Sequence, residues 1–326
     1  MILDGQITCD GENGPKSSTA GGGSGGSVWI NCKELSGFGT ISVNGGAGSP
    51  SSGGGGSGGR IAIYHQTMKK YNGSISAKGG TSSIEDGGPG TVYLETKNET
   101  RVVSRVLRLD NRGRKYSLSL GKRGHLQHGI YRDISGFGCV SWFNETTTFT
   151  FDEFHIYGNV HVALYGSGVS RNVHFYSRKL FGDRDAVFHI GRKQTVTFDI
   201  VDIYYPINTH VYRNGSIEVP SRLSLREVWM EVNGTLSEAG DYVIDRNGEL
   251  YLWSAAHSKD EREGVFEFGN ISVRSRGQLY LTSEPPDSQI VLNATRFVVN
   301  AGGVVKANNL LVSAVNATVD VGGNID

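Results

Sequence analysis

The sequence predicts an all-β fold of short stacked strands, a solenoid of the right-handed parallel β-helix type with glycine-rich loops. The first observation is a phrase of glycine followed by β-formers that recurs at steps of about thirty residues, within the period range of stacked repeats. The copies of this motif are Gly25–Ile30, Gly58–Ile63 and Pro89–Leu94. The second observation is another phrase between these copies, at Gly39–Gly46 and again at Gly73–Gly80. A unit of two such short runs cannot bury its own apolar face, so it must stack on its neighbours.

Glycine content separates a first segment, residues 1–100, from the rest of the chain. Twenty-five of the 47 glycines lie in residues 1–90, mostly in Gly21–Gly26, Gly45–Gly59 and Gly79–Gly90. Glycine allows tight corners and close approach of backbones. A flexible Gly/Ser linker would show no regular apolar runs between its glycines. We therefore expect residues 1–100 to form a glycine-rich repeat segment with ordered strands.

Residues 101–326 are expected to continue the same solenoid. Runs of β-branched, aromatic and aliphatic residues predict strands at Val102–Leu109, Thr147–Phe151 and Val160–Leu164. The last part of the chain repeats at steps of a little over twenty residues. Its repeats are Phe268–Val273, Leu292–Val299 and Val315–Val321.

Side chains should alternate along each strand between the core and the solvent. In Val187–Ile190 and Phe198–Ile203 this alternation predicts that His189, Asp199 and Asp202 point outward. In-register stacking would then arrange outward residues in rows along one face, a surface suited to an extended ligand or a second filament.

The phrases at Gly25–Ile30, Gly39–Gly46, Gly58–Ile63 and Gly90–Leu94 resemble the glycine-rich repeats of very large surface and extracellular proteins of bacteria and protists. The resemblance covers residues 21–95 and implies a stacked β-solenoid used in adhesion or matrix. Beyond about residue 100 the chain is similar only to right-handed parallel β-helices of the pectate-lyase-like group in general. No catalytic motif of that group matches position by position.

Charge and hydropathy exclude two classes of partner. Lys and Arg number 32 against 32 Asp and Glu, with no basic stripe, which argues against nucleic acid and anionic membranes. No apolar run approaches the roughly 18 residues that a membrane span needs. The first residues, Met1–Gly5, have no basic or apolar stretch typical of a signal peptide.

Asn-x-Ser/Thr sequons are more frequent than the roughly three that chance would give, and each is an acceptor motif for N-glycosylation. They predict glycosylation at Asn72, Asn98, Asn144, Asn214, Asn233, Asn270, Asn293 and Asn316. The motifs favour an extracellular or cell-surface location, and a Ser/Thr-rich β composition is the alternative explanation. With no signal peptide, we expect a segment of a longer extracellular protein.

Cysteine usage is too sparse for a disulfide scaffold. The three cysteines are Cys9, Cys32 and Cys139. Cys9 and Cys32 are the expected disulfide pair, because both lie near the start, and Cys139 is then free or paired elsewhere.

The sequence offers only weak candidates for a catalytic or metal-binding site. Asp183, Asp185 and His189 could provide acid and base groups for polysaccharide cleavage, but Gly182-Asp183 is equally typical of a turn. His155, His161 and His174 could form a metal-binding row, yet their spacing is irregular. We therefore expect no catalytic residue, no metal and no cofactor.

Outward aromatic residues could stack on sugars, or could belong to the core. The candidates are Tyr204, Tyr205, Trp229 and Trp253.

The expected function is a non-catalytic, structural or adhesive segment of a large N-glycosylated extracellular or cell-surface protein. It would serve as a rigid rod whose partners are other copies, other matrix or surface proteins, and glycans. The alternative is a β-helix protein that binds or cleaves polysaccharides.

Overall fold

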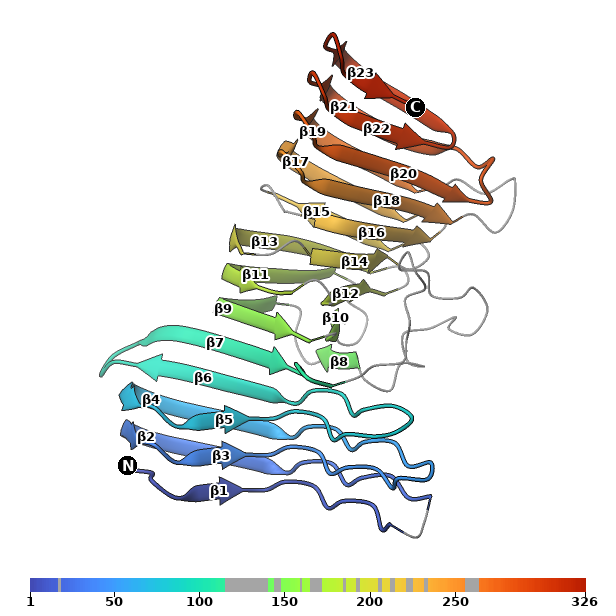
Figure 1. Ribbon diagram of the computed structural model, residues 1–326. Helices are drawn as coiled ribbons and strands as arrows, with labels where there is room; N and C mark the ends of the chain where they lie inside the picture. The colour runs from blue at the N-terminus through green and yellow to red at the C-terminus, as the bar shows by residue number, and fades with distance from the viewer. Residues whose placement is uncertain are drawn as a thin grey trace. The chain divides into compact units, whose positions relative to one another are not determined.

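The computed structural model is all-β, with long parallel-strand sheets and no helix among the residues it describes (Figure 1). These residues are 1–16, 19–114, 140–143, 148–158, 160–164, 172–183, 186–191, 194–204, 207–211, 215–220, 225–231, 234–255 and 264–326. The prediction of an all-β chain is thereby confirmed.

The chain divides into two compact units. The first comprises Met1–Ser141, Thr150–His161 and Ser177–Ala186, and the second comprises Trp142–Phe149, Val162–Tyr176 and Val187–Asp326. Four strands contain residues of both units: β8 (Val140–Phe143), β9 (Thr148–Tyr157), β10 (His161–Leu164) and β11 (Asn172–Phe181).

Two sets of strands enclose the core of the first unit. The first set is the three-stranded parallel sheet β1 (Gln6–Thr8), β3 (Thr40–Ser42) and β5 (Ser74–Ser76). The second set pairs in the order β2 (Ser27–Gly37), β4 (Arg60–Tyr71), β6 (Thr91–Lys97), β7 (Val102–Asp110) and β9. Alternate residues of β2, β4 and β6 are buried, so the repeated phrases of the sequence place aliphatic side chains in the same columns. The columns are Val28–Ile61–Val92 and Ile30–Ile63–Leu94.

The pair β6–β7 is antiparallel and interrupts the parallel order. A turn closes the hairpin, in which the Asn98 side-chain oxygen accepts hydrogen bonds from the backbone N–H groups of Thr100 and Arg101. This turn lies where the sequence predicts the end of the glycine-rich segment. Parallel pairing resumes between β7 and β9, with Leu107 beside Phe154 and Leu109 beside Ile156.

Glycine-rich runs extend from these strands and pack backbone against backbone. The runs are residues 11–14, 20–26, 43–49, 53–59, 77–80 and 85–90, and we call them the glycine stack. Hydrogen bonds cross it in more than one direction: Gly56 N–H donates to Gly46 C=O at 2.9 Å, and Gly22 N–H donates to Gly54 C=O at 2.9 Å. At its last layer, the buried Asn111 side chain accepts from Gly79 N–H and donates to Gly87 C=O. An amide side chain there provides the bonds that a further backbone layer would make.

The close approach in the glycine stack leaves no room for a Cβ atom at Gly56. A Cβ there would lie 2.0 Å from the Gly23 carbonyl oxygen, whereas one at Gly54 would meet its nearest backbone atom at 3.8 Å. The two glycines belong to the same run, and only one of them requires glycine.

We expect Gly56→Ala to destabilise the chain by about 3 kcal/mol, because overpacking against rigid backbone forces a shift of the neighbouring run. Gly54→Ala is the matched control and should change stability by less than about 0.5 kcal/mol, or raise it slightly through a less flexible unfolded chain. Urea unfolding of both variants measures the difference. Equal losses would contradict close backbone packing at Gly56.

Two parallel sheets form the second unit. One pairs β13 (Thr195–Ile203), β15 (Ser216–Val219), β17 (Thr235–Ile244), β19 (Val265–Val273), β21 (Ile290–Val299) and β23 (Leu310–Val319) in that order. The other pairs β12 (Val187–Ile190), β14 (Ile207–Val211), β16 (Leu225–Glu231), β18 (Glu249–Ala255), β20 (Gln278–Glu284), β22 (Val304–Ala307) and β24 (Asn324–Ile325).

Residues of one kind stand above one another in these sheets. Leu250, Leu279 and Val305 form one fully buried column, and Leu252 pairs with Leu281 in another. On the other face of the same strands, Tyr251 stacks on Tyr280 with ring centroids 4.5 Å apart. The alternation of inward and outward side chains expected for this part of the chain is thus present in β18 and β20.

The expectation for His189 is wrong. Every residue of β12 is buried and His189 is fully so, because this short strand is covered on both faces. Asp202 is exposed and Asp199 is half-buried.

One four-residue turn recurs between successive strands of the second unit. Its copies are Asp245–Gly248, Arg274–Gly277, Asn300–Gly303 and Asp320–Gly323, and in each the fourth N–H donates to the first C=O. The third residue of each copy has positive φ: Asn247, Arg276, Gly302 and Gly322. Of these four third residues, Arg276, at φ 62°, is the least suited to a positive φ.

Arg276→Gly should therefore stabilise the chain by about 0.5–1 kcal/mol, since glycine has no steric penalty at positive φ. The exposed neighbour Ser275 serves as control: Ser275→Gly only loosens the unfolded chain and should destabilise by a similar amount. Thermal unfolding of both variants measures the two signs. A destabilising Arg276→Gly would show that the Arg276 side chain, and not its backbone, governs this turn.

Candidate functional site

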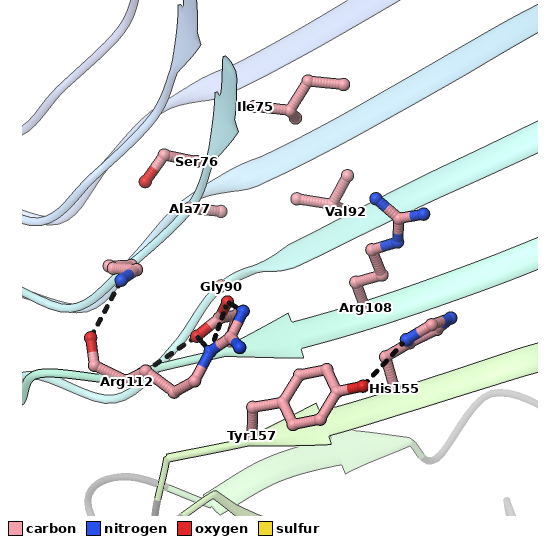
Figure 2. Close-up of a pocket in the computed structure, with 11 residues that line it drawn as sticks. Ile75, Ser76, Ala77, Gly90, Val92, Arg108, Arg112, His155 and Tyr157 are labelled. Carbon is pink, nitrogen blue, oxygen red and sulfur yellow. Dashed lines mark hydrogen bonds and ion pairs between the residues drawn. The ribbon is translucent and has the colours of Figure 1, made fainter. Parts of the chain in front are cut away.

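A cavity of about 350 Å³ opens in the first unit between the edge of β5 and the strands β6, β7 and β9 (Figure 2). Charged and polar side chains line much of it. Arg108 and Asp110 come from β7, His155 and Tyr157 from β9, and Lys78 from the run that follows β5.

The cavity exists because one sheet face changes from apolar to polar. In the antiparallel pair Val92 lies opposite Arg108, so the two side chains share a face, and Arg108 in turn lies beside His155 of β9. On β6 this face is part of the aliphatic core. On β7, Val106 still packs against this core, but Leu107 and Leu109 are buried on the opposite face, and this leaves Arg108 and Asp110 facing the cavity.

The other wall is a sheet edge. β5 pairs with β3 on one side, and no described strand pairs with its second side. Alternate residues of a parallel strand direct their backbone groups to opposite sides. Ser74 N–H donates to Gly39 C=O and Ser76 C=O accepts from Val43 N–H, so the backbone groups of Ile75 are directed to the cavity side.

An ion pair between Arg112 and Asp110 forms one rim of the cavity. The Arg112 guanidinium donates two hydrogen bonds to Asp110, from Nε at 3.1 Å and from the terminal nitrogen at 2.5 Å. It also lies over the Tyr157 ring, 4.5 Å from the ring centroid. Burial alone would raise the pKa of Asp110, but the hydrogen bonds and charge of Arg112 outweigh burial and hold the pKa below its ordinary value. Asp110 is therefore ionised at neutral pH and neutralises Arg112.

Arg108 differs from Arg112 because its charge has no partner of opposite sign among the described residues. Its neighbours in the sheet are Val92 and His155, and the side chain is exposed to solvent. The positive charge of Arg108 contributes to lowering the pKa of His155. Lys78 adds a second cation, whose Nζ donates to the Arg112 carbonyl oxygen at 2.8 Å.

His155 is held by residues of its own strand, β9, and of β11. Its Nε2 lies 3.1 Å from Glu153, its Nδ1 lies 3.4 Å from the Tyr157 hydroxyl, and its ring stacks on Phe181 at 4.4 Å. Burial lowers the pKa of His155, and the hydrogen bond to Glu153 opposes this only in part. Near neutral pH the imidazole is uncharged, so it orients neighbours and does not add to the positive charge.

The structure does not gather the residues proposed from sequence for catalysis. The Asp183 carboxylate accepts a hydrogen bond from Gly158 N–H at 2.5 Å, which is the role of a turn residue. His189 is fully buried in β12, and Asp185 lies outside the described residues. His155, His161 and His174 do not come together either: in the described ranges, no group of three or more His, Cys, Asp or Glu side chains could hold a metal ion.

The aromatic candidates for sugar stacking are scattered. Trp253 is buried and Tyr204 is exposed. Tyr205 and the side chain of Trp229 lie outside the described part of the chain. A stack that the sequence reasoning did not single out lies on β2 and β4, where the exposed Trp29 packs on Tyr64 with centroids 5.0 Å apart.

Three sequon asparagines are exposed: Asn72, Asn98 and Asn316. Asn270 and Asn293 are half-buried in strands, and Asn270 donates a hydrogen bond to Asp241. Asn144, Asn214 and Asn233 lie outside the described residues.

The structure does not bring Cys9 and Cys32 together, and both are free thiols. Cys9 lies beside Gly26, which precedes β2. Cys32 is six residues farther along that strand, or about 20 Å at the usual rise per residue. A disulfide requires Cα atoms within about 7 Å. Cys139 lies outside the described residues.

Sequence reasoning missed the cavity residues Arg108, Asp110, Arg112 and Tyr157. The available signal was the alternation Leu107-Arg108-Leu109-Asp110, in which charged residues occupy the positions between two core leucines.

Comparison with known proteins gives no match to a family model, to a curated protein or to a solved structure. Within the described ranges, no helix is long and apolar enough to cross a membrane.

Proposed function

We propose that this chain is a non-catalytic structural or adhesive segment of an N-glycosylated extracellular or cell-surface protein, built as a parallel β-solenoid. The observation that carries the proposal is the columnar register of the parallel strands, in which Leu250, Leu279 and Val305 follow one another in a fully buried column. Such columns suit a stiff body, because each strand is held by backbone bonds to the strands on either side.

The positions of the sequons support an extracellular location. Asn72 and Asn316 are exposed, and Asn98 lies in the exposed turn between β6 and β7. The bonds that hold this turn use the Asn98 Oδ1 atom and leave the Nδ2 nitrogen, which carries an N-glycan, outside them.

Secretion from eukaryotic cells behind an added signal peptide should yield chains with glycans at Asn72, Asn98 and Asn316. Intact mass before and after treatment with peptide N-glycosidase measures occupancy, and Asn→Gln at each position should remove one glycan. Asn293→Gln, at a half-buried strand position, is the matched control and should leave the mass of the glycans unchanged. Secreted protein without any glycan would remove the glycoprotein part of the proposal.

The edge of a sheet supplies a surface for assembly with other copies. β23 pairs with β21 on one side, no described strand pairs with its other side, and it exposes Leu311, Val315 and Val319. An unpaired edge with exposed aliphatic side chains is a template for pairing with another chain.

Sedimentation velocity should therefore show association of the chain that increases with concentration. Val315→Lys should suppress it, because a charged side chain on an edge strand opposes pairing. Val201→Lys is the control, since Val201 is also exposed but β13 has a neighbour on each side. A wild-type chain that stays monomeric, or two variants with equal effects, would argue against assembly through this edge.

Polysaccharide binding is the second candidate function, and the cavity beside β5 favours it. Cleavage is not favoured, because Asp183 is engaged by a backbone amide and His189 is buried.

A further inference from the structure

The cavity between β5 and β7 has an excess of positive charge. Lys78, Arg108 and Arg112 contribute to its lining, and the carboxylate among the lining residues is that of Asp110. Asp110 is bound to Arg112, and its charge also interacts with Lys78. Three cations thus share one carboxylate, and the charge of Arg108 is left to be balanced from outside. A cavity of this kind attracts an anion.

The geometry of Arg108 suits an oxyanion. Its guanidinium extends from β7 into the cavity beside Val92 (Figure 2). A guanidinium presents paired N–H donors that match the two oxygens of a carboxylate or the oxygens of a sulfate. Arg108 stands next to the uncharged, half-buried ring of His155, and the ion pair between Arg112 and Asp110 lies at the rim of the same cavity.

The remaining lining suits the hydroxyl groups and the C–H face of a sugar. Lys78 uses one of its three donors on the Arg112 carbonyl oxygen, and Ser76 donates to Asn44 but can still accept. The edge backbone of Ile75 offers a donor and an acceptor, while Val92 and the Ile75 side chain add apolar surface. A volume of about 350 Å³ lies within the range of small-ligand sites.

We propose that this cavity binds the acidic group, a carboxylate or a sulfate, of an anionic saccharide, and that Arg108 is the residue that recognises it. The proposal rests on the second candidate function and is independent of the glycans and of the β23 edge. If the chain binds no acidic saccharide, the proposed structural role still stands, because that role is tested by the glycan mass and by sedimentation velocity.

Isothermal titration calorimetry with three hexasaccharides tests the proposal on the full chain. An oligogalacturonate supplies carboxylates, a heparin-derived oligosaccharide supplies mainly sulfates, and maltohexaose is neutral. Binding of either acidic ligand but not of maltohexaose is the expected result, and the stronger acidic ligand identifies the group. Binding of none of them, or equal binding of maltohexaose, overturns the proposal.

Arg108→Gln should weaken binding of the acidic ligand by at least about tenfold. Arg105→Gln is the matched control: it removes the same charge from the same strand, but Arg105 lies on the opposite face, paired with Glu95 at 3.5 Å. It should change the affinity by less than about twofold. Equal effects of the two variants would show that net charge, and not the cavity, attracts the ligand.

Arg108→Lys covers the case in which the glutamine variant fails to fold. Lysine keeps the charge but lacks the paired donors, so binding of the acidic ligand weaker than that of the wild type is expected. Wild-type affinity in a folded Arg108→Lys chain would overturn recognition by the guanidinium.

Discussion

Parallel backbone pairing in register is the constraint on which the structure depends. Each strand must align its N–H and C=O groups with those of the strand before it, and this alignment sets which side chains stand above one another. Leu250 is thereby placed over Leu279, and Tyr251 over Tyr280. A one-residue slip would move the buried leucines to the solvent face, so the alternating pattern and the register support each other.

The glycine stack satisfies the same constraint without side chains. Where the strands end, the backbone continues into runs that exchange hydrogen bonds with neighbours in more than one direction, as at Gly22 and Gly56. Such packing is possible only if the space of a Cβ is available to a neighbouring carbonyl oxygen. The composition of residues 1–90 is therefore a consequence of close backbone contact and not of flexibility.

The cavity arises where the small sheet of the first unit ends and the larger set of strands continues beyond it. The small sheet ends at β5, while the strands β7 and β9 carry on the larger set. Because β7 returns antiparallel and places its leucines on the opposite face, the side chains that β7 presents next to β5 beyond Val106 are those of Arg108 and Asp110. Arg108, Asp110 and Tyr157 line the cavity, and the free edge of β5 remains accessible. A break in the repeat thus supplies the concave, charged surface that the regular strands lack.

The sequence by itself determined the all-β class and the alternation of core positions, because short repeated phrases with period-two burial leave little choice of secondary structure. It also marked the change near residue 100 through the loss of glycine. It did not give the reversal at β7, since a hairpin turn and a parallel connection can have similar local composition. His189 was misplaced because burial on both faces of β12 depends on what covers the strand. The separation of Cys9 from Cys32 and the meeting of Arg108, Lys78 and Tyr157 were decided by tertiary structure alone, because register between distant strands brings together residues that no local spacing relates.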